Sequence, residues 1–505
     1  MWDLAPSIAA AAGSALLGLV SVVVGRTLLA RRRHYVFSPA DLSSADLTAE
    51  DLQGSEQRLA GGLAIPTISV SHDAPPPKKE LLDYHKHLRE SFPTVFNSPL
   101  VTVEIVNELS LLLTVHGSRS ELRPYLLLSH MDVVPVNEER WNHPPFGGLI
   151  KDGFIIGRGA IDVKQTTHAI LESLEHRLKT GDAPKRSLFV ALGHDEEING
   201  TRGAKEIGKL LGERGAQPLF IIDEGTAILD RFMPGVRSLV GVVGVCEKGY
   251  LSVEVTARGE AGHSSIPPPE TAVGRLGHAL ARLHPNPQPL LLGRGPEMEL
   301  IQLAGAVAKG PFRFVYANFW LFKGLIQKAF LKNRAMQATI QTSTAVTIIK
   351  GGYKENVVPG EATAVINHRV SPLMDRDAVI AVDRAAMRDP SLELKVLRES
   401  APSPIAPYGE EDGPFGLIGA TLQQMYGDEA MAVPGVMIAN TDTRHYLELT
   451  DHVYRFNPIV LRPDQLGMYH GDNEMIAVDN YHHCVRFYYR LMKNSESDAA
   501  VAKMP

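Results

Sequence analysis

Histidine and acidic side chains follow apolar stretches of this sequence, and their types and spacing suit a metal site. His130 and Asp132 come directly after the apolar run 125–128, which has the composition of a buried strand. Side chains two apart on a strand share one face of a sheet. A metal-bound imidazole usually donates its second ring N–H to a carboxylate. His130 could therefore be a metal ligand, with Asp132 as the carboxylate that orients it.

Further carboxylates stand at the ends of other predicted elements. They are Asp162 before a helical pattern at 166–178, Glu196 and Glu197 after an apolar run at 187–192, and Asp223 and Glu224 after another at 218–222. Clustered carboxylates carry a heavy desolvation cost unless a cation or solvent compensates them. Ligands of open α/β sheets bind outside the carboxyl ends of the strands. The sequence therefore predicts a divalent-metal site at such an edge.

The order of these motifs resembles the co-catalytic zinc aminoacylase and carboxypeptidase superfamily. The motifs are HMDVVP at 130–135, GRGAID at 157–162, HDEE at 194–197, DEG at 223–225, GHSS at 262–265, ENVVP at 355–359, NHR at 367–369, TDTRH at 441–445 and HGDNE at 470–474. The likeness covers about residues 52–491. Segments 141–146 and 262–268, with an apolar insert near 310–335, favour the subgroup of N-fatty-acyl-amino-acid synthase/hydrolases and yeast-type carboxypeptidase S.

The resemblance implies two zinc ions. The implied ligands are Asp162 bridging both ions, His130 with Asp223 or Glu224 on one ion, and Glu197 with His470 on the other. Asp132 would orient His130, and Glu196 would be the general base that deprotonates the bridging water. Zinc lowers the pKa of bound water towards 7. Nitrogen and oxygen ligands also suit cobalt and manganese, so the preference for zinc comes from the resemblance alone.

The resemblance also implies residues that contact the substrate. His263, which by composition alone is an exposed loop histidine, would reach across a dimer interface and stabilise the tetrahedral oxyanion. Arg369 and Asn356 would bind the substrate carboxylate, since guanidinium–carboxylate pairing can be bidentate. Arg444 and Asp442 are weaker candidates for this site.

The pattern of predicted elements gives an α/β fold with two parts. Strands and helices alternate over 47–245, which predicts a mostly parallel sheet with helices on both faces. The predicted domains are an N-terminal membrane anchor at 1–34, a catalytic domain at 47–245 and 373–493, and an inserted α+β lid at 247–372. In the resembled family this lid also forms the dimer, so a homodimer is expected.

We expect hydrolysis of the amide bond in N-acyl amino acids with long acyl chains, with condensation as the reverse reaction. The aromatic stretch 311–331 is compatible with lid core, a dimer interface, an acyl-chain channel or a membrane-docking helix. One alternative is a carboxypeptidase of the carboxypeptidase S type that cleaves small peptides. Another is a membrane-anchored binding protein without catalysis, which the intact ligand set with Glu196 disfavours.

Composition and the N-terminal segment bear on partners and location. The formal charge of −6 argues against nucleic acid as a partner, and the two cysteines, Cys246 and Cys484, provide no disulfide framework. Residues 7–30 are apolar except for small polar residues and Arg26, and three arginines follow at 31–33, which favours an uncleaved membrane anchor over a signal peptide. The arginines indicate a cytoplasmic enzyme, whereas the resemblance implies a lumenal, vacuolar, extracellular or secreted one.

Overall fold

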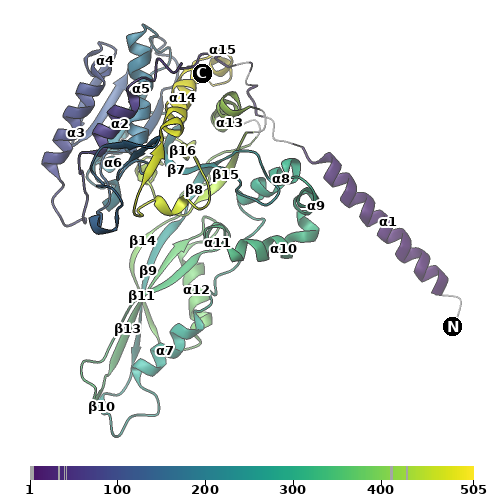
Figure 1. The fold of residues 1–505 in the computed structure, drawn as a ribbon. Helices are drawn as coiled ribbons and strands as arrows, with labels where there is room; N and C mark the ends of the chain where they lie inside the picture. Colours follow the sequence, from purple (N-terminus) through teal and green to yellow (C-terminus); the bar gives the residue numbers. More distant parts are fainter. Residues whose placement is uncertain are drawn as a thin grey trace.

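The computed structural model describes residues 5–31, 35–38, 40, 42–409, 413–427 and 430–504, with side chains in the first helix described from residue 14. A broad body carries a narrow extension, and helix α1 (Ala5–Leu29) projects away from both (Figure 1). Arg32, Arg33 and His34, part of the predicted basic topology signal, lie outside the described residues.

The body contains an eight-stranded sheet in the order β1-β2-β6-β3-β7-β16-β8-β15. Its strands are β1 (Val101–Val106), β2 (Ser110–Val115), β3 (Tyr125–His130), β6 (Leu188–Gly193), β7 (Ile221–Leu229), β8 (Val240–Glu247), β15 (Met431–Met437) and β16 (Val453–Leu461). The pairs β3–β6, β3–β7, β7–β16 and β8–β15 are parallel. The predicted α/β class with a mostly parallel central sheet is confirmed.

Helices cover both faces of this sheet because its strands are apolar on both sides. In β3, Leu127 packs into one large core, whereas Leu126 and Leu128 pack into a smaller core on the opposite face. The large core takes residues from α2 (Ser55–Leu63), α3 (Lys78–Ser91), α5 (Lys164–Lys179), α13 (Gly413–Tyr426) and α14 (Val478–Ser495), and the smaller core from α6 (Ala204–Glu213). Alternate side chains of each strand are thereby removed from water.

The extension is built on a four-stranded antiparallel sheet in the order β11-β13-β9-β14. Its elements are β9 (Gly249–Arg258), β11 (Ser343–Gly351), β13 (Glu361–Val370) and β14 (Glu393–Ser400), with α7 (Ala272–Arg282) and α12 (Arg376–Met387). The residues of β14 fall within 373–493, which was predicted to be catalytic, but β14 pairs with β9. The inserted part therefore continues beyond residue 372, because β14 extends its sheet through backbone pairing with β9.

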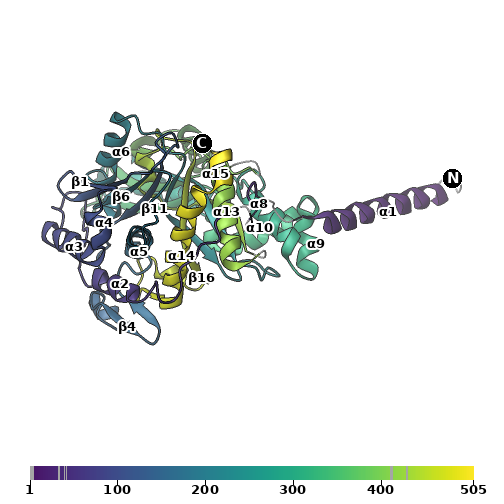
Figure 2. The same ribbon diagram turned by 90° about the horizontal axis from the view of Figure 1, so that it is seen from above.

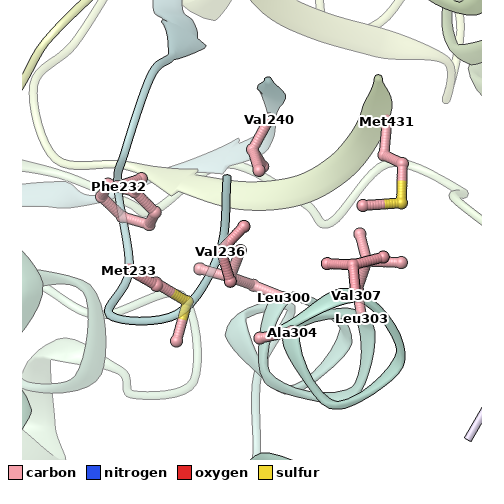
Figure 3. Close-up of a pocket in the computed structure, with 9 residues that line it drawn as sticks. All are labelled: Phe232, Met233, Val236, Val240, Leu300, Leu303, Ala304, Val307 and Met431. Atoms are coloured by element: carbon pink, nitrogen blue, oxygen red, sulfur yellow. The ribbon is translucent and has the colours of Figure 1, made fainter. Parts of the chain in front are cut away.

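Short strands and helices complete the extension. Strands β10 (Gly262–His263) and β12 (Val357–Val358) pair at the tip farthest from the body (Figure 1). Helices α8 (Glu297–Val307), α9 (Pro311–Ala317), α10 (Phe319–Lys332) and α11 (Arg334–Ile340) lie where the two parts meet. A small apolar pocket separates α8 from the first residues of β8 and β15, with Val240 and Met431 on one side and Leu303 on the other (Figure 3).

Helix α1 contacts the rest of the chain near its C-terminal end and otherwise extends outwards (Figure 2). Within the described residues, no helix combines the length and hydropathy that crossing a bilayer requires, so the predicted spanning anchor over 7–30 lacks support. Cys246 and Cys484 are both buried and free.

Candidate metal centre

His130 ends β3 and is buried beneath three carboxylates. Its Nδ1 lies 3.0 Å from the backbone oxygen of Asp132 and 3.4 Å from Asp132 Oδ1. On the other side of the ring, Nε2 lies 3.3 Å from Glu224 Oε1 and 3.5 Å from Asp162 Oδ1. The ring is thus fixed on one edge by Asp132 and presents its other nitrogen to two acids, as the sequence predicts for a metal ligand.

Asp132 also positions the acids that follow β6. Its Oδ1 accepts a hydrogen bond from the backbone N–H of Glu196 at 3.1 Å, and its Oδ2 accepts one from Glu197 at 3.2 Å. The two neighbouring strand ends, β3 and β6, are therefore joined by one buried carboxylate. This explains how residues more than 60 positions apart in sequence come together.

His470 reaches the same place from the loop after β16. Its Nε2 lies 3.1 Å from Asp162 Oδ2 and 3.1 Å from Glu197 Oε2. Asp162 therefore faces an imidazole with each of its two oxygens, His130 with Oδ1 and His470 with Oδ2. A carboxylate in that position can bridge two cations.

The structure separates the adjacent acids Asp223 and Glu224. Strand β7 begins at Ile221, so the pair lies within the strand, not after its end as predicted. Consecutive strand residues point to opposite faces. Glu224 faces His130, whereas Asp223 accepts a hydrogen bond from the Glu224 backbone N–H at 2.8 Å. Glu224 therefore joins the His130 cluster and Asp223 does not.

Two groups of side chains could each hold an ion. Ligand atoms of His130, Glu196 and Glu224 lie within 4.8 Å of one another, as do those of His130, Asp162 and Glu197. His130 Nε2 and Glu197 Oε1 are buried without a hydrogen-bond partner among the described residues. Orphaned nitrogen and oxygen donors of this kind match the preferences of a divalent metal such as zinc.

The electrostatics of the cluster also call for a cation. Burial by itself lowers the pKa of His130, but Glu224, Asp132 and Asp162 raise it well above its usual value. Hydrogen bonds to Asp162 and Glu197 raise the pKa of His470 to about 10. Burial, with repulsion from Glu224 and Asp442, raises the pKa of Glu196 well above that of an ordinary glutamate. The cluster thus holds excess negative charge that a proton or a metal ion would compensate.

Two arginines lie near one another beside the cluster. Arg444 Nη2 lies 3.5 Å from Glu196 Oε1. Arg369, at the end of β13, donates from Nη1 to Asn440 Oδ1 at 2.8 Å and stacks over the Tyr250 ring with its Cζ 5.1 Å from the centroid. Burial, and repulsion from Arg444, lower the pKa of Arg369. Asn440 and Tyr250 carry no motif that sequence reasoning could have recognised.

The remaining predicted site residues lie elsewhere. His263 is exposed at the tip of the extension, where its Nδ1 accepts from the Ser265 backbone N–H at 3.1 Å. Asn356 is beside it, because the Ser264 N–H donates to the Asn356 carbonyl at 3.2 Å. Strand β10, which carries His263, lies at the tip of the extension (Figure 1), whereas His130 ends β3 in the central sheet of the body. Asp442 is buried, and burial with repulsion from Asp223 raises its pKa well above the usual range.

Sequence reasoning gave Glu474 no role, although it is central to the site's construction. Glu474 is fully buried and accepts backbone N–H bonds from Gly159 at 3.1 Å, Ile161 at 2.7 Å and Asp162 at 3.1 Å. Its Oε2 also pairs with Arg158 Nη1 at 2.7 Å. A small sheet of β4 (Leu149–Lys151), β5 (Phe154–Ile156) and β17 (Met475–Ala477) brings the two loops together. In the sequence, the only hint of this role was that Glu474 ends the HGDNE motif at 470–474.

The fold and the cluster of histidine and acidic side chains define the class: a two-part α/β metallohydrolase. The chain belongs to peptidase family M20/M25/M40, whose model matches residues 126–494. The predicted superfamily is confirmed, and the chain is a metal-dependent amidohydrolase.

Similar proteins include the N-fatty-acyl-amino acid synthase/hydrolase PM20D1 of Mus musculus, 39% identical over 453 residues and 90% of each chain. "Probable carboxypeptidase S-like 2" of Dictyostelium discoideum is 36% identical over 494 residues, covering 95% of this chain and 93% of that protein. Among solved structures, the metallo-carboxypeptidase Sso-CP2 of Sulfolobus solfataricus has a TM-score of 0.62 at 18% identity, covering 88% of this chain and 99% of that one. That likeness shows a shared fold.

Proposed function

We propose that this protein hydrolyses the amide bond between a long fatty acyl group and an amino acid, and that it also catalyses the reverse condensation. The observation that carries the proposal is the position of Glu196, which lies beside His130 and Glu224 and 3.5 Å from Arg444. A proton-accepting carboxylate thus stands between candidate metal ligands and a cation that can hold a substrate carboxylate. The named mouse relative supports the fatty acyl substrate.

Five residues would hold the metal: His130, Asp162, Glu197, Glu224 and His470. They would hold two zinc ions, and Asp162 would offer one carboxylate oxygen on the His130 side and the other on the His470 side. When bound, such a pair supplies Lewis-acid activation of the attacking water and of the amide carbonyl.

Glu196 would move the proton in both halves of the reaction. It takes one proton from the attacking water, whose oxygen forms a bond to the acyl carbon, and then delivers that proton to the leaving nitrogen as the C–N bond breaks. The products are a fatty acid and an amino acid. Burial beside acids raises the pKa of Glu196, which makes its carboxylate a stronger base.

The substrate carboxylate would be held by Arg369 and Arg444. Asn440 accepts from Arg369 and Tyr250 stacks beneath it, so the guanidinium is held in one orientation. His263 and Asn356 would act from a second copy of the chain, because both are exposed at the tip of the extension in a single chain. This arrangement requires a homodimer formed through the inserted part.

The test is a substrate panel on the purified protein. We expect a higher kcat/KM for N-oleoyl than for N-acetyl amino acids, and N-oleoyl product when oleate and free amino acid are supplied together. A preference for the acetyl substrates would overturn the assignment to lipids while leaving amide hydrolysis intact.

A second candidate is a carboxypeptidase that cleaves small dipeptides, which the similarity to the Dictyostelium protein supports. Dipeptides and N-acyl amino acids both present a free carboxylate to Arg369, so the site alone favours neither. Dipeptides therefore belong in the same panel, and faster turnover of dipeptides than of N-oleoyl amino acids would select this candidate.

A further inference from the structure

Helices α9 and α10 carry six large apolar side chains that are exposed to solvent. They are Phe312 at 40%, Phe314 at 37%, Trp320 at 48%, Leu321 at 44%, Leu325 at 58% and Leu331 at 38% exposed. We call these residues the insert surface. Contiguous exposed apolar patches on a folded protein mark a contact with a partner, a ligand or a membrane.

Helix α1 extends this surface. Asn318, at the junction of α9 and α10, donates from Nδ2 to Val23 O at 3.2 Å and to Thr27 Oγ1 at 3.0 Å. The rest of the described helix is largely exposed and apolar, with Leu17 at 70% and Leu28 at 74% exposed. Figures 1 and 2 show α1 leaving the body beside α9 and α10. Exposed apolar side chains thus occur both on α1 and on the helices that it contacts.

The charge of these segments has one sign. The sequence contains no aspartate or glutamate between positions 300 and 354, or between positions 4 and 40, although the whole chain has a formal charge of −6. Around α10 the exposed cations are Lys309, Lys323, Lys328, Lys332 and Arg334. Within the described residues, none of these five forms an ion pair. A positive, apolar surface on an acidic protein complements an anionic, apolar partner.

The surface is also held firmly to the catalytic sheet. The backbone N–H of Lys309 donates to Gly235 O at 2.9 Å, and the Tyr316 hydroxyl donates to Pro234 O at 3.1 Å. The loop that carries these carbonyls also contributes Met233 and Val236 to the apolar pocket of Figure 3. A partner on the insert surface would therefore be fixed relative to the body of the enzyme.

We propose that the insert surface, with the adjoining part of α1, docks on the interface of an anionic phospholipid bilayer without crossing it. Aromatic and aliphatic side chains would enter the headgroup region while the lysines contact anionic headgroups. A second copy of the same face is disfavoured, because it would bring unpaired cations of one sign together without an acid between them.

The experiment is vesicle cosedimentation of the full chain with phosphatidylcholine alone and with phosphatidylserine added. The test variant is Lys323→Glu with Lys328→Glu, and the control is Lys151→Glu with Lys179→Glu, two exposed lysines on the catalytic part with the same change of charge. We expect about tenfold or stronger preference for the phosphatidylserine vesicles, weakened by salt. The test variant should lose that preference and the control should keep it.

Three results would overturn the proposal: equal binding to both vesicles, equal loss in test and control variants, or full binding by the test variant. Because α1 is unchanged in every variant, retained binding by the test variant would show that α1 contacts the vesicle and that the lysines of α10 do not. A vesicle-free change in sedimentation mass caused only by the test variant would show that the face joins two copies. Circular dichroism melting checks that each variant is folded. Vesicle binding is measured without substrate, so its result is independent of the proposed enzymatic function.

Discussion

The buried carboxylate of Glu196 has charged neighbours of both signs. Glu224 and Asp442 repel it, and Arg444 Nη2 lies 3.5 Å from its Oε1. Changing Glu196→Gln keeps the shape of the side chain but removes the proton acceptor. We expect kcat to fall about 10²- to 10⁴-fold, while the content of bound metal measured by elemental analysis stays constant. An unaffected kcat would show that Glu196 is not the base.

We expect substitution of Glu474 to affect stability and metal binding, because this residue positions the cluster without belonging to it. Glu474→Gln would leave the buried Arg158 guanidinium without its charge partner and weaken the three N–H bonds that hold the 159–162 loop. Breaking a buried pair costs about 3–5 kcal/mol, so we expect a lower Tm and loss of bound metal. Asp472→Asn is the control, because the ion pair of Asp472 among the described residues is with the exposed Arg140 at the surface.

Residue identities in this site were predictable to different degrees. His130 and Asp132 could be paired from their two-residue spacing, although β3 ends at His130 and Asp132 follows the strand instead of sharing its face. The choice between Asp223 and Glu224 could not be made, because it depends on where β7 begins. Glu474 was missed because its partners lie more than 300 positions away in the sequence, and such contacts leave no local pattern.

At the scale of elements, Lys248 joins the two parts of the chain. It follows β8 and precedes β9, and its Nζ donates to Ala338 O at 2.9 Å, Gln341 O at 2.8 Å and Ser343 Oγ at 3.0 Å. Burial, and repulsion from Arg369, lower the pKa of Lys248 from 10.5 to about 7. One buried side chain thereby ties the β8–β9 connection to the α11–β11 connection.

This shift predicts a pH dependence of stability. Between pH 7 and 10 the unfolded chain binds the Lys248 proton and the folded chain does not, so this group makes stability rise with pH. Relative to Lys248→Met, the native chain should gain up to about 1.4 kcal/mol of unfolding free energy per pH unit over that range. Urea denaturation at pH 7 and pH 9 measures it, and parallel changes in both proteins would contradict the low pKa.

The helices and strands themselves were largely predictable from the sequence. The exception is the assignment of a strand to a domain, which depends on pairing with strands far away in the sequence. The apolar runs before His130 and Glu196 became β3 and β6 as expected. The residues of β14 were assigned to the wrong part, because their own sequence does not reveal that they pair with β9.

For the whole molecule, removal of metal should affect stability as well as activity. Without a cation, the buried acids around His130 repel one another or take up protons, as the raised pKa of about 8 for Glu224 indicates; burial is its main cause. We expect a chelator to abolish turnover and lower the Tm, and zinc to restore both. Turnover that survives exhaustive chelation would exclude a metal-dependent reaction.

The proposed homodimer makes a sharper prediction. If His263 serves the site of the other copy, Glu196→Gln and His263→Ala chains are each inactive but complement one another when mixed. After subunit exchange, half of the dimers carry one intact site, so activity should recover to about a quarter of the native value. No recovery, with exchange verified by mass, would place His263 outside the reaction.

The position of His470 has a consequence for biosynthesis. Its imidazole meets Asp162 and Glu197 only after the whole inserted sheet and β16 have been made. If His470 is a metal ligand as proposed, a nascent chain cannot complete its metal site until translation has passed residue 470.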